Sequence, residues 1–86
     1  MIEKIYAVKD VKIDAFKTPF FSFNDATALR IFEQAVNQQG TELHDYPEDF
    51  TLHRLGTYSS VDGEIIPEKP KQIAHAPDYK HEKEPT

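Results

Sequence analysis

Residues 25–38 of the chain read DATALRIFEQAVNQ and predict one amphipathic helix. Apolar side chains recur through this stretch at helical spacing, so they share one face of the helix. Asn24 or Ser22 can cap the helix by accepting hydrogen bonds from free backbone N–H groups, and Asp25 suits the positive end of the helix dipole. Gly40 is a natural residue to follow the helix, because glycine adopts positive φ without strain. The apolar stripe consists of Ala28, Ile31, Phe32, Ala35 and Val36.

Two alternating segments precede the helix and predict a β-hairpin. Residues 2–8 and 13–18 both alternate between apolar and polar side chains, with a polar turn at 9–12 between them. Pro19 cannot donate to a strand ladder, so we expect the second strand to end there.

Two further strands are predicted after the helix. Residues 41–49 are polar and predict a loop, whereas residues 50–58 predict a third strand. The Asp-Gly pair at 62–63 favours a tight hairpin turn. A short fourth strand is then expected at 64–66, with Pro67 closing it.

The predicted order of elements is β-β-α-β-β, which indicates an α+β fold with one helix on an antiparallel sheet. We expect a folded domain at residues 1–67 and a polar, flexible tail at 68–86. A single helix covers only one sheet face, and a domain of 86 residues has a marginal core. We therefore expect the open sheet face to serve self-association, as a dimer or larger homo-oligomer, or ligand binding.

Composition narrows the classes of function. The chain has no cysteine, which excludes a disulfide scaffold, a thiolate nucleophile and a cysteine-ligated metal, and which favours a reducing cytosol. No signal peptide and no membrane-spanning segment is recognisable, so no membrane partner is expected. The net charge is −5. Acidic and basic residues balance over 1–38, so the acidic excess lies in 39–86.

No pattern in the chain indicates catalysis. A glycine-rich phosphate loop, a nucleophile–base pair and a pair of carboxylates in an apolar setting are all missing from the sequence. The four histidines have no metal-binding spacing. We expect a protein that is not an enzyme and that needs neither a cofactor nor a metal.

Lysines and aromatic residues are concentrated between residues 9 and 30, a pattern typical of single-stranded DNA binders. Such proteins combine cations along the backbone path with rings that stack on bases, at about 1–3 kcal/mol per base. Free N–H groups at the start of the helix can also meet a phosphate. Phe16 and Phe23 belong to the same cluster. The predicted nucleic-acid-binding residues are Lys9, Lys12, Lys17, Phe20, Phe21 and Arg30.

Each of these residues also has a structural interpretation. The phenylalanines can form the core where the hairpin meets the helix, since a small domain needs its aromatic side chains inside. The lysines can be ordinary turn residues. Arg30 can pair with Glu48 or Asp49 of the polar loop. On the strands, Tyr6, Arg54 and Tyr58 can form a polar-aromatic surface on the open sheet face or plain strand surface.

An ordered set of short motifs resembles a known family. The set begins with IYAV at 5–8, continues through PFF at 19–21, TALRIF at 27–32, YPEDFTL at 46–52 and LGTY at 55–58, and ends with DGEI at 62–65. It resembles the small non-structural protein of gokushoviruses, which belong to the Microviridae. The resemblance implies a phage protein made in the host bacterial cytoplasm that acts in single-stranded genome synthesis and is labelled DNA-binding. It carries over no catalytic residue.

Two hypotheses about function follow. In the first, the chain binds single-stranded DNA without sequence specificity during phage genome replication. In the second, it is a protein–protein regulator that binds the phage replication initiator or a host replication factor. The acidic excess in residues 39–86 favours the second, because nucleic-acid affinity depends on phosphate neutralisation.

Overall fold

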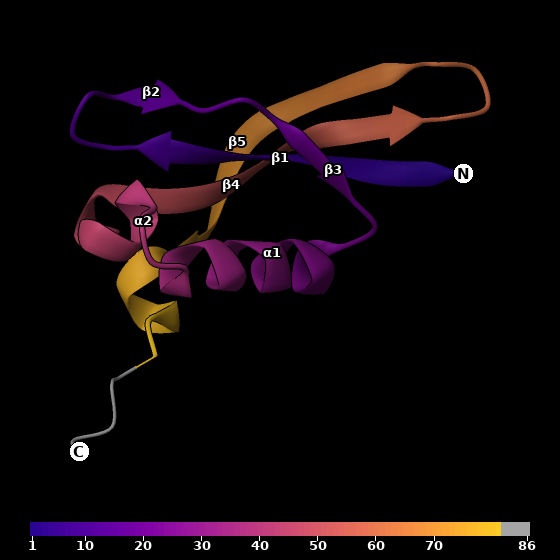
Figure 1. Ribbon diagram of the computed structural model, residues 1–86. Helices are drawn as coiled ribbons and strands as arrows, with labels where there is room; N and C mark the ends of the chain where they lie inside the picture. The colour runs from indigo at the N-terminus through magenta and orange to yellow at the C-terminus, as the bar shows by residue number, and fades with distance from the viewer. Residues whose placement is uncertain (82–86) are drawn as a thin grey trace.

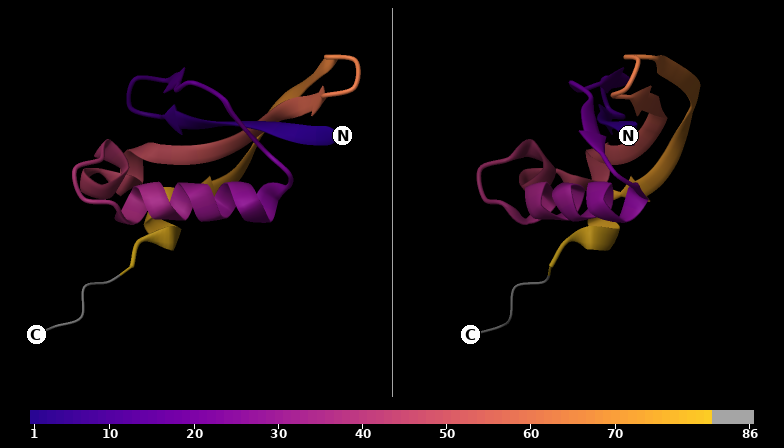
Figure 2. Two further views of the ribbon diagram at one scale, coloured as in Figure 1. Left: turned by 45° about the vertical axis from the view of Figure 1, so that its right-hand side comes forward. Right: turned by 90° about the vertical axis from the view of Figure 1, so that its right-hand side faces the viewer.

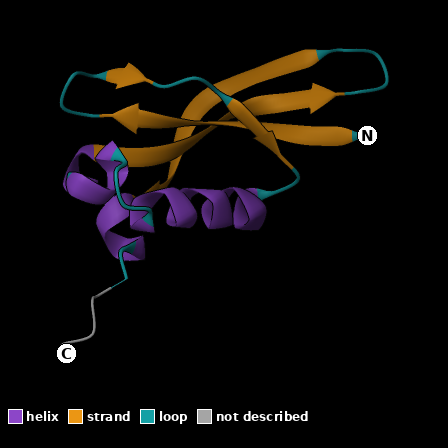
Figure 3. Ribbon diagram, in the orientation of Figure 1, coloured by secondary structure: helices purple, strands orange, loops and turns teal. Residues whose placement is uncertain are grey.

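One main helix, α1, lies across one face of an antiparallel sheet in the computed structural model, which describes residues 1–81 (Figure 1). The sheet has five strands, with the order β2-β1-β4-β5, and β3 also pairs with β1. The predicted α+β class is therefore confirmed (Figure 3). The elements are β1 (Ile2–Asp10), β2 (Ala15–Phe16), β3 (Phe20–Ser22), α1 (Asp25–Asn37), α2 (Glu42–Asp45), β4 (Phe50–Ser59) and β5 (Ile65–His75).

Helix α1 begins at a capping box, as its sequence predicts. The Asn24 side chain accepts a hydrogen bond from the Thr27 amide at 2.9 Å, and the Thr27 hydroxyl accepts one from the Asn24 amide at 3.3 Å. These two bonds satisfy N–H groups that a helix otherwise leaves free. The helix faces the sheet through Ala28, Phe32 and Val36. Ile31, which we placed on the buried stripe, is instead 46% exposed.

The core lies between α1 and the adjacent part of the sheet. Its fully buried large side chains come from β1, α1 and β4, and short helical turns close its end. Leu43 of α2, Ala74 of β5 and Ala76 join this cluster. The largest fully buried side chains are Tyr6, Phe32, Phe50, Leu52 and Val36.

The second predicted strand is divided in the structure. Only Ala15 and Phe16 pair with β1, because residues 11–14 form a turn. Asp14 in this turn has a φ of 56°, a conformation that Asp and Asn tolerate better than most residues. After Pro19 the chain returns to β1 as β3, whose Phe20 pairs with Tyr6. The polar loop at 41–49 contains α2 and a 3-10 turn at Pro47–Asp49.

The predicted end of the last strand at Pro67 was wrong. β5 continues to His75 and is followed by a 3-10 turn, η2 (Ala76–Tyr79), so most of the predicted tail at 68–86 is folded. The Tyr79 ring packs against Phe32, with ring centroids 6.3 Å apart. β5 accepts proline because it is an edge strand, where an N–H can be dispensed with. Residues 82–86 of the predicted tail lie outside the described residues.

The strands are longer than the helix that covers them. An α-helix of 13 residues extends about 20 Å, and a strand of 11 residues about 35 Å. The start of β1 and the β4–β5 hairpin therefore project past the N-terminal end of α1 (Figure 2). We call this projection, comprising residues 1–5 and 56–67, the arm. It gives the molecule extents of 52 × 26 × 19 Å.

Gly56 permits the close approach of β4 and β5 within the arm. A Cβ at this position would collide with the backbone carbonyl oxygen of Ile66 and lie 3.1 Å from the Cα of Pro67. We expect Gly56→Ala to lower the free energy of unfolding by about 1–3 kcal/mol, measured by chemical denaturation. Gly63→Asn is the control, because a Cβ there meets nothing within 4 Å and Asn tolerates positive φ. Equal losses in the two variants would contradict the steric argument.

Candidate nucleic-acid interface

No helix of residues 1–81 lies on the sheet face opposite α1, and the strand register shows which side chains this face carries. Tyr6 and Val8 of β1 contact the core, so their neighbours in the strand point to the other face. Lys9 is in register with Phe16 and Thr51, and Ile5 with Phe21. We call this surface the open face. Its residues are Ile5, Lys9, Phe16, Phe21, Thr51, His53 and Tyr58, of which Ile5 and Thr51 are buried.

Phe16 is the centre of one cluster on the open face. Its ring is 43% exposed, and the Lys9 ammonium lies 5.4 Å from the ring centroid. The His53 ring meets the Phe16 ring edge-on, with centroids 5.3 Å apart. Lys9 also forms an ion pair with Asp14 at 2.9 Å. This cluster presents an aromatic ring and a cation side by side, the pair of groups that stacks on a base and contacts its phosphate.

Phe21 forms a second aromatic position further along β1. Its ring is 45% exposed and contacts the Tyr58 ring, with centroids 5.2 Å apart. Phe16 pairs with Lys9 and Phe21 with Ile5, so the two phenylalanines lie four strand residues apart, about 14 Å. This spacing exceeds the 3.4 Å rise between stacked bases, so two neighbouring bases of a stack could not each contact one of the two rings.

Lys12 lies in the turn between β1 and β2, at the end of the open face that carries Phe16. Its side chain is exposed, and its backbone amide donates to the Asp10 carboxylate at 3.0 Å. Within residues 1–81 its ammonium takes part in no ion pair. Lys9, Lys12 and Phe21, three of the six predicted nucleic-acid-binding residues, thus lie on or next to one surface.

The other three predicted residues lie elsewhere. Phe20 packs against the core and stacks on Tyr6, with ring centroids 5.8 Å apart. The Lys17 ammonium lies 3.5 Å from the Glu42 carboxylate of α2 and above the Phe50 ring. Arg30 is exposed on α1 and borders a shallow surface depression, and among the described residues it has no ion pair with Glu48 or Asp49. These three belong to the helix side of the sheet.

One of the two interpretations of Tyr6, Arg54 and Tyr58 put them together on the open face, and Phe16 was not among the six predicted nucleic-acid-binding residues. Tyr6 and Arg54 lie on the helix side, so of the expected polar-aromatic surface only Tyr58 is on the open face. Strict alternation from Lys9 along β1 would have assigned Tyr6 correctly. Alternation alone does not give the face on which Arg54 lies, because the register of β1 and β4 shifts between Ile5 and Tyr6.

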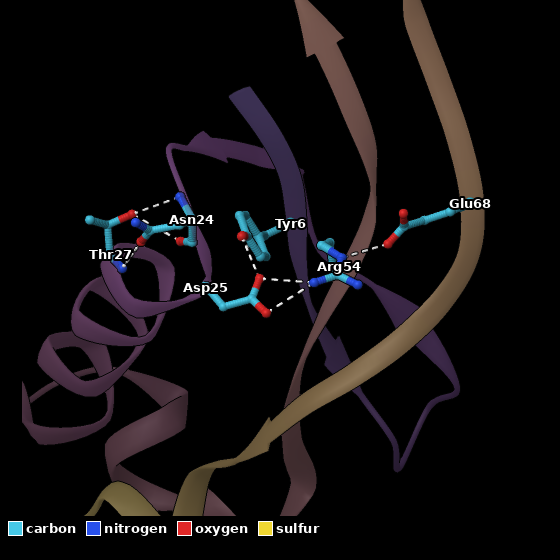
Figure 4. A network of polar contacts seen from close by, with 6 residues as sticks. All are labelled: Tyr6, Asn24, Asp25, Thr27, Arg54 and Glu68. Atoms are coloured by element: carbon cyan, nitrogen blue, oxygen red, sulfur yellow. Dashed lines mark hydrogen bonds and ion pairs between the residues drawn. The ribbon is translucent and has the colours of Figure 1, made fainter. Parts of the chain in front are cut away.

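Tyr6 and Arg54 instead form a polar network that fixes α1 on the sheet (Figure 4). The Tyr6 hydroxyl donates to the Asp25 carboxylate at 2.7 Å, and the Arg54 guanidinium donates to both carboxylate oxygens at 3.0 and 3.2 Å. Arg54 also donates to Glu68 of β5 at 2.6 Å. The network therefore connects the first turn of α1 with β1, β4 and β5.

The pKa values of Asp25 and Tyr6 in the network, and of His53 on the open face, are shifted by their surroundings. The hydrogen bond from Tyr6 lowers the pKa of Asp25, and Arg54 lowers it further. Burial, with the hydrogen bond to Asp25, raises the pKa of Tyr6. On the open face, burial and the nearby Lys9 charge lower the pKa of His53, so His53 is neutral at pH 7 and adds no cation to the Phe16 cluster.

Two further findings concern other kinds of site. Within residues 1–81, no three histidine or carboxylate side chains are grouped so that they could hold a metal ion. In the same part of the chain, no helix is long and apolar enough to cross a membrane.

Fold and site together define a small α+β protein whose uncovered sheet face presents aromatic rings beside lysines. The chain belongs to the phage ORF5 protein family, whose family model matches residues 3–79. The match agrees with the resemblance to the gokushovirus non-structural protein, and it includes all of β5 and η2. No curated protein and no solved structure matches the chain significantly.

The Asp25 network gives a prediction about pH. We expect Asp25→Asn to lower the free energy of unfolding at pH 7 by about 1 kcal/mol, a small value because the Asp25 side chain is 39% exposed. The folded-state pKa of Asp25 is depressed, so its contribution is present above the unfolded-state pKa of about 3.9 and is lost as the pH falls through the folded-state pKa. The difference between wild type and variant should therefore narrow below about pH 4.

Chemical denaturation between pH 7 and pH 2.5 measures this difference. Asp78→Asn, which changes an exposed aspartate of η2, is the control and should follow wild type throughout. A difference between Asp25→Asn and wild type that stays constant down to the lowest pH would contradict the assignment.

Proposed function

We propose that this phage protein binds single-stranded DNA without sequence specificity through its open face. In this proposal it acts in single-stranded genome replication in the host bacterial cytoplasm, as a binding protein and not as an enzyme. The observation that carries the proposal is the exposure of Phe16 and Phe21 on one uncovered sheet face, with the Lys9 ammonium against the Phe16 ring.

The rings supply most of the binding energy in this proposal. Stacking contributes about 1–3 kcal/mol per base and does not depend on base identity, because every base has a π-face. Two exposed rings thus suit a protein without sequence preference. A β-sheet surface holds the rings at fixed positions, so little conformational entropy is lost when the bases stack.

The cations contribute a smaller part. Lys9 and Lys12 adjoin the rings, and binding that neutralises two phosphates predicts a slope of about −1.4 in a plot of log affinity against log salt concentration. This weak salt dependence is compatible with the acidic chain. The exposed acids Glu42, Asp45 and Glu48 lie around α2 and the turn that follows it, on the helix side of the sheet.

The same acidic segment favours a second candidate function. Glu42, Asp45 and Glu48 are exposed within one short segment, and Asp45 and Glu48 in particular would suit a basic patch on another protein, since Glu42 already pairs with Lys17. In that case the chain would regulate the phage replication initiator or a host replication factor by binding it. The two candidates use opposite sides of the sheet, so variants can separate them.

Removal of each ring tests the first candidate. We expect Phe16→Ala and Phe21→Ala each to weaken binding of a fluorescent oligodeoxythymidine by about 5- to 150-fold, the equivalent of one lost stacking contact. Fluorescence anisotropy at about 20 mM and about 150 mM salt measures the affinity and gives the salt slope.

Tyr46→Ala is the matched control, because Tyr46 is an aromatic residue that is 59% exposed next to α2, away from the open face. It should bind like wild type. If wild type does not bind the oligonucleotide even at low salt, direct DNA binding is rejected and the protein-binding function is what remains. A loss in Tyr46→Ala equal to that in Phe16→Ala would show that the open face is not the site.

Asp14 should oppose DNA binding, because its carboxylate competes with phosphate for Lys9. The hydrogen bond from Lys9 lowers the pKa of Asp14, so the carboxylate is charged at neutral pH. We expect Asp14→Asn to raise the affinity for the oligonucleotide by about 2- to 5-fold, since it removes one negative charge beside the phosphate that Lys9 would contact. Asparagine also tolerates the positive φ at this position.

The same anisotropy assay measures this gain. Asp62→Asn, in the distant β4–β5 hairpin, is the control and should gain less. An unchanged or reduced affinity in Asp14→Asn would contradict the role assigned to Lys9.

A further inference from the structure

Two pairs of aromatic rings meet on the open face. The centroids of the Phe16 and His53 rings are 5.3 Å apart, and the two ring planes form an angle of 85°. The centroids of the Phe21 and Tyr58 rings are 5.2 Å apart, at an angle of 60°. In each pair one ring comes from a short strand beside β1, and its partner comes from β4 on the other side of β1. We call these two contacts the ring pairs.

The strand spacing shows that the rings of each pair lean toward one another. Neighbouring strands lie about 4.8 Å apart, so the backbones of β2 and β4, with β1 between them, are separated by about 10 Å. The Phe16 and His53 ring centroids are only 5.3 Å apart, so both side chains extend over β1 instead of pointing straight into solvent. β3 lies on the same side of β1 as β2, so Phe21 and Tyr58 also meet above β1.

Buried apolar residues of β1 form the floor beneath the ring pairs. Ala7 is fully buried, although its register with His53 directs its Cβ to the open face. A larger side chain at this position would occupy the space in which the two rings meet. Ile5, which is in register with Phe21, is buried as well. The contact between the rings therefore depends on the residues of β1 as well as on the rings themselves.

We propose that His53 and Tyr58 are positioning residues, which hold the Phe16 and Phe21 rings in the orientation that stacks on bases. Their role rests on the proposed function, because the same face and the same two phenylalanines are involved. It gives β4 a part in DNA binding that does not require either of its rings to touch the DNA.

Phe16 needs such support because its own strand is short. β2 consists of two exposed residues, and Phe16 is in register with Lys9 of β1 at its very end. Within residues 1–81, the Phe16 ring has one aromatic contact, His53, and one cationic contact, Lys9. A side chain with few contacts samples several rotamers, and it loses this freedom when a base stacks on it. An edge-on contact with a second ring removes part of this cost before DNA binds.

His53 is itself held in one orientation. Its Nε2 lies 2.8 Å from Thr51 Oγ1, whereas its Nδ1 is buried and has no hydrogen-bond partner within residues 1–81. A buried N–H without an acceptor is unfavourable, so the proton resides on Nε2, which donates to Thr51, and Nδ1 carries the lone pair. Burial, together with the Lys9 charge, lowers the pKa of His53. His53 therefore meets Phe16 as a neutral ring.

Double-mutant cycles with the fluorescent oligodeoxythymidine at low salt test the proposal. His53→Ala should weaken binding by about 2- to 10-fold in the wild-type background, the range expected for the loss of one aromatic pair. In a Phe16→Ala background the same change should have no further effect, whereas in a Phe21→Ala background it should keep its full effect. Tyr58→Ala should show the reverse dependence. The cycles thus assign each ring of β4 to one phenylalanine.

His75→Ala is the matched control, and it should bind like wild type in every background. His75 is a partly exposed histidine of β5 in register with Thr51, and its Nε2 donates to the Glu48 carbonyl oxygen at 3.1 Å. Thr51→Val removes the acceptor of the His53 proton but keeps the His53 ring. It should therefore cause a smaller loss than His53→Ala, and only when Phe16 is present. Circular dichroism and thermal unfolding confirm that each variant is folded.

Three results would overturn the positioning role and leave DNA binding by the open face standing. The first is wild-type affinity in His53→Ala. The second is an equal loss from His53→Ala with and without the Phe16 ring, which would mean that His53 touches DNA itself or acts only on stability. The third is the absence of nuclear Overhauser contacts between the Phe16 and His53 rings in the DNA-free protein. A wild type that does not bind the oligonucleotide is a different outcome, because it rejects the proposed function and this role together.

Discussion

The rest of the structure depends on a difference in length between one helix and the strands beneath it. Helix α1 is about 20 Å long, whereas β5 extends about 35 Å, so the helix covers one end of one sheet face. A chain of this size has no second helix of comparable length among its described residues. The opposite face and the arm therefore remain uncovered. The open face, to which we assign binding, lacks a helix because the described residues supply only one long helix.

The polar network at Asp25 decides which end of the sheet the helix covers. Apolar contacts alone would allow α1 to slide along the strands, because the hydrophobic effect is not directional. The Asp25 carboxylate has two partners from the sheet, the buried Tyr6 hydroxyl and the Arg54 guanidinium, and it stands in the first turn of α1. Charge-assisted hydrogen bonds of this kind require specific geometry. They fix the N-terminal end of the helix at Arg54, just before the arm begins.

The sequence predicted those elements whose signals are local. The α1 period and the Asn24 cap gave the helix to within one residue. β5 was predicted too short because Pro67 and Pro70 are breakers in a central strand but are tolerated at an edge, and edge position is a property of the whole sheet. Only some of the six predicted binding residues share the open face, for the same reason. Neighbours in sequence such as Phe20 and Phe21 point to opposite faces, and the face becomes known only when the register with β1 is fixed.

In the function that we propose, the negative net charge would favour single strands over duplex DNA. A duplex carries one charge per 1.7 Å of its axis, so it is repelled by an acidic protein more strongly than a single strand is. Its bases are already stacked on one another, and exposed rings such as Phe16 and Phe21 cannot reach their faces. A single strand offers lower charge density and free π-faces. In a bacterium full of duplex DNA, a site that takes most of its energy from two rings and little from two lysines would leave the chromosome unbound. If the open face binds DNA as we propose, weak attraction to phosphate is what would give it selectivity for single strands.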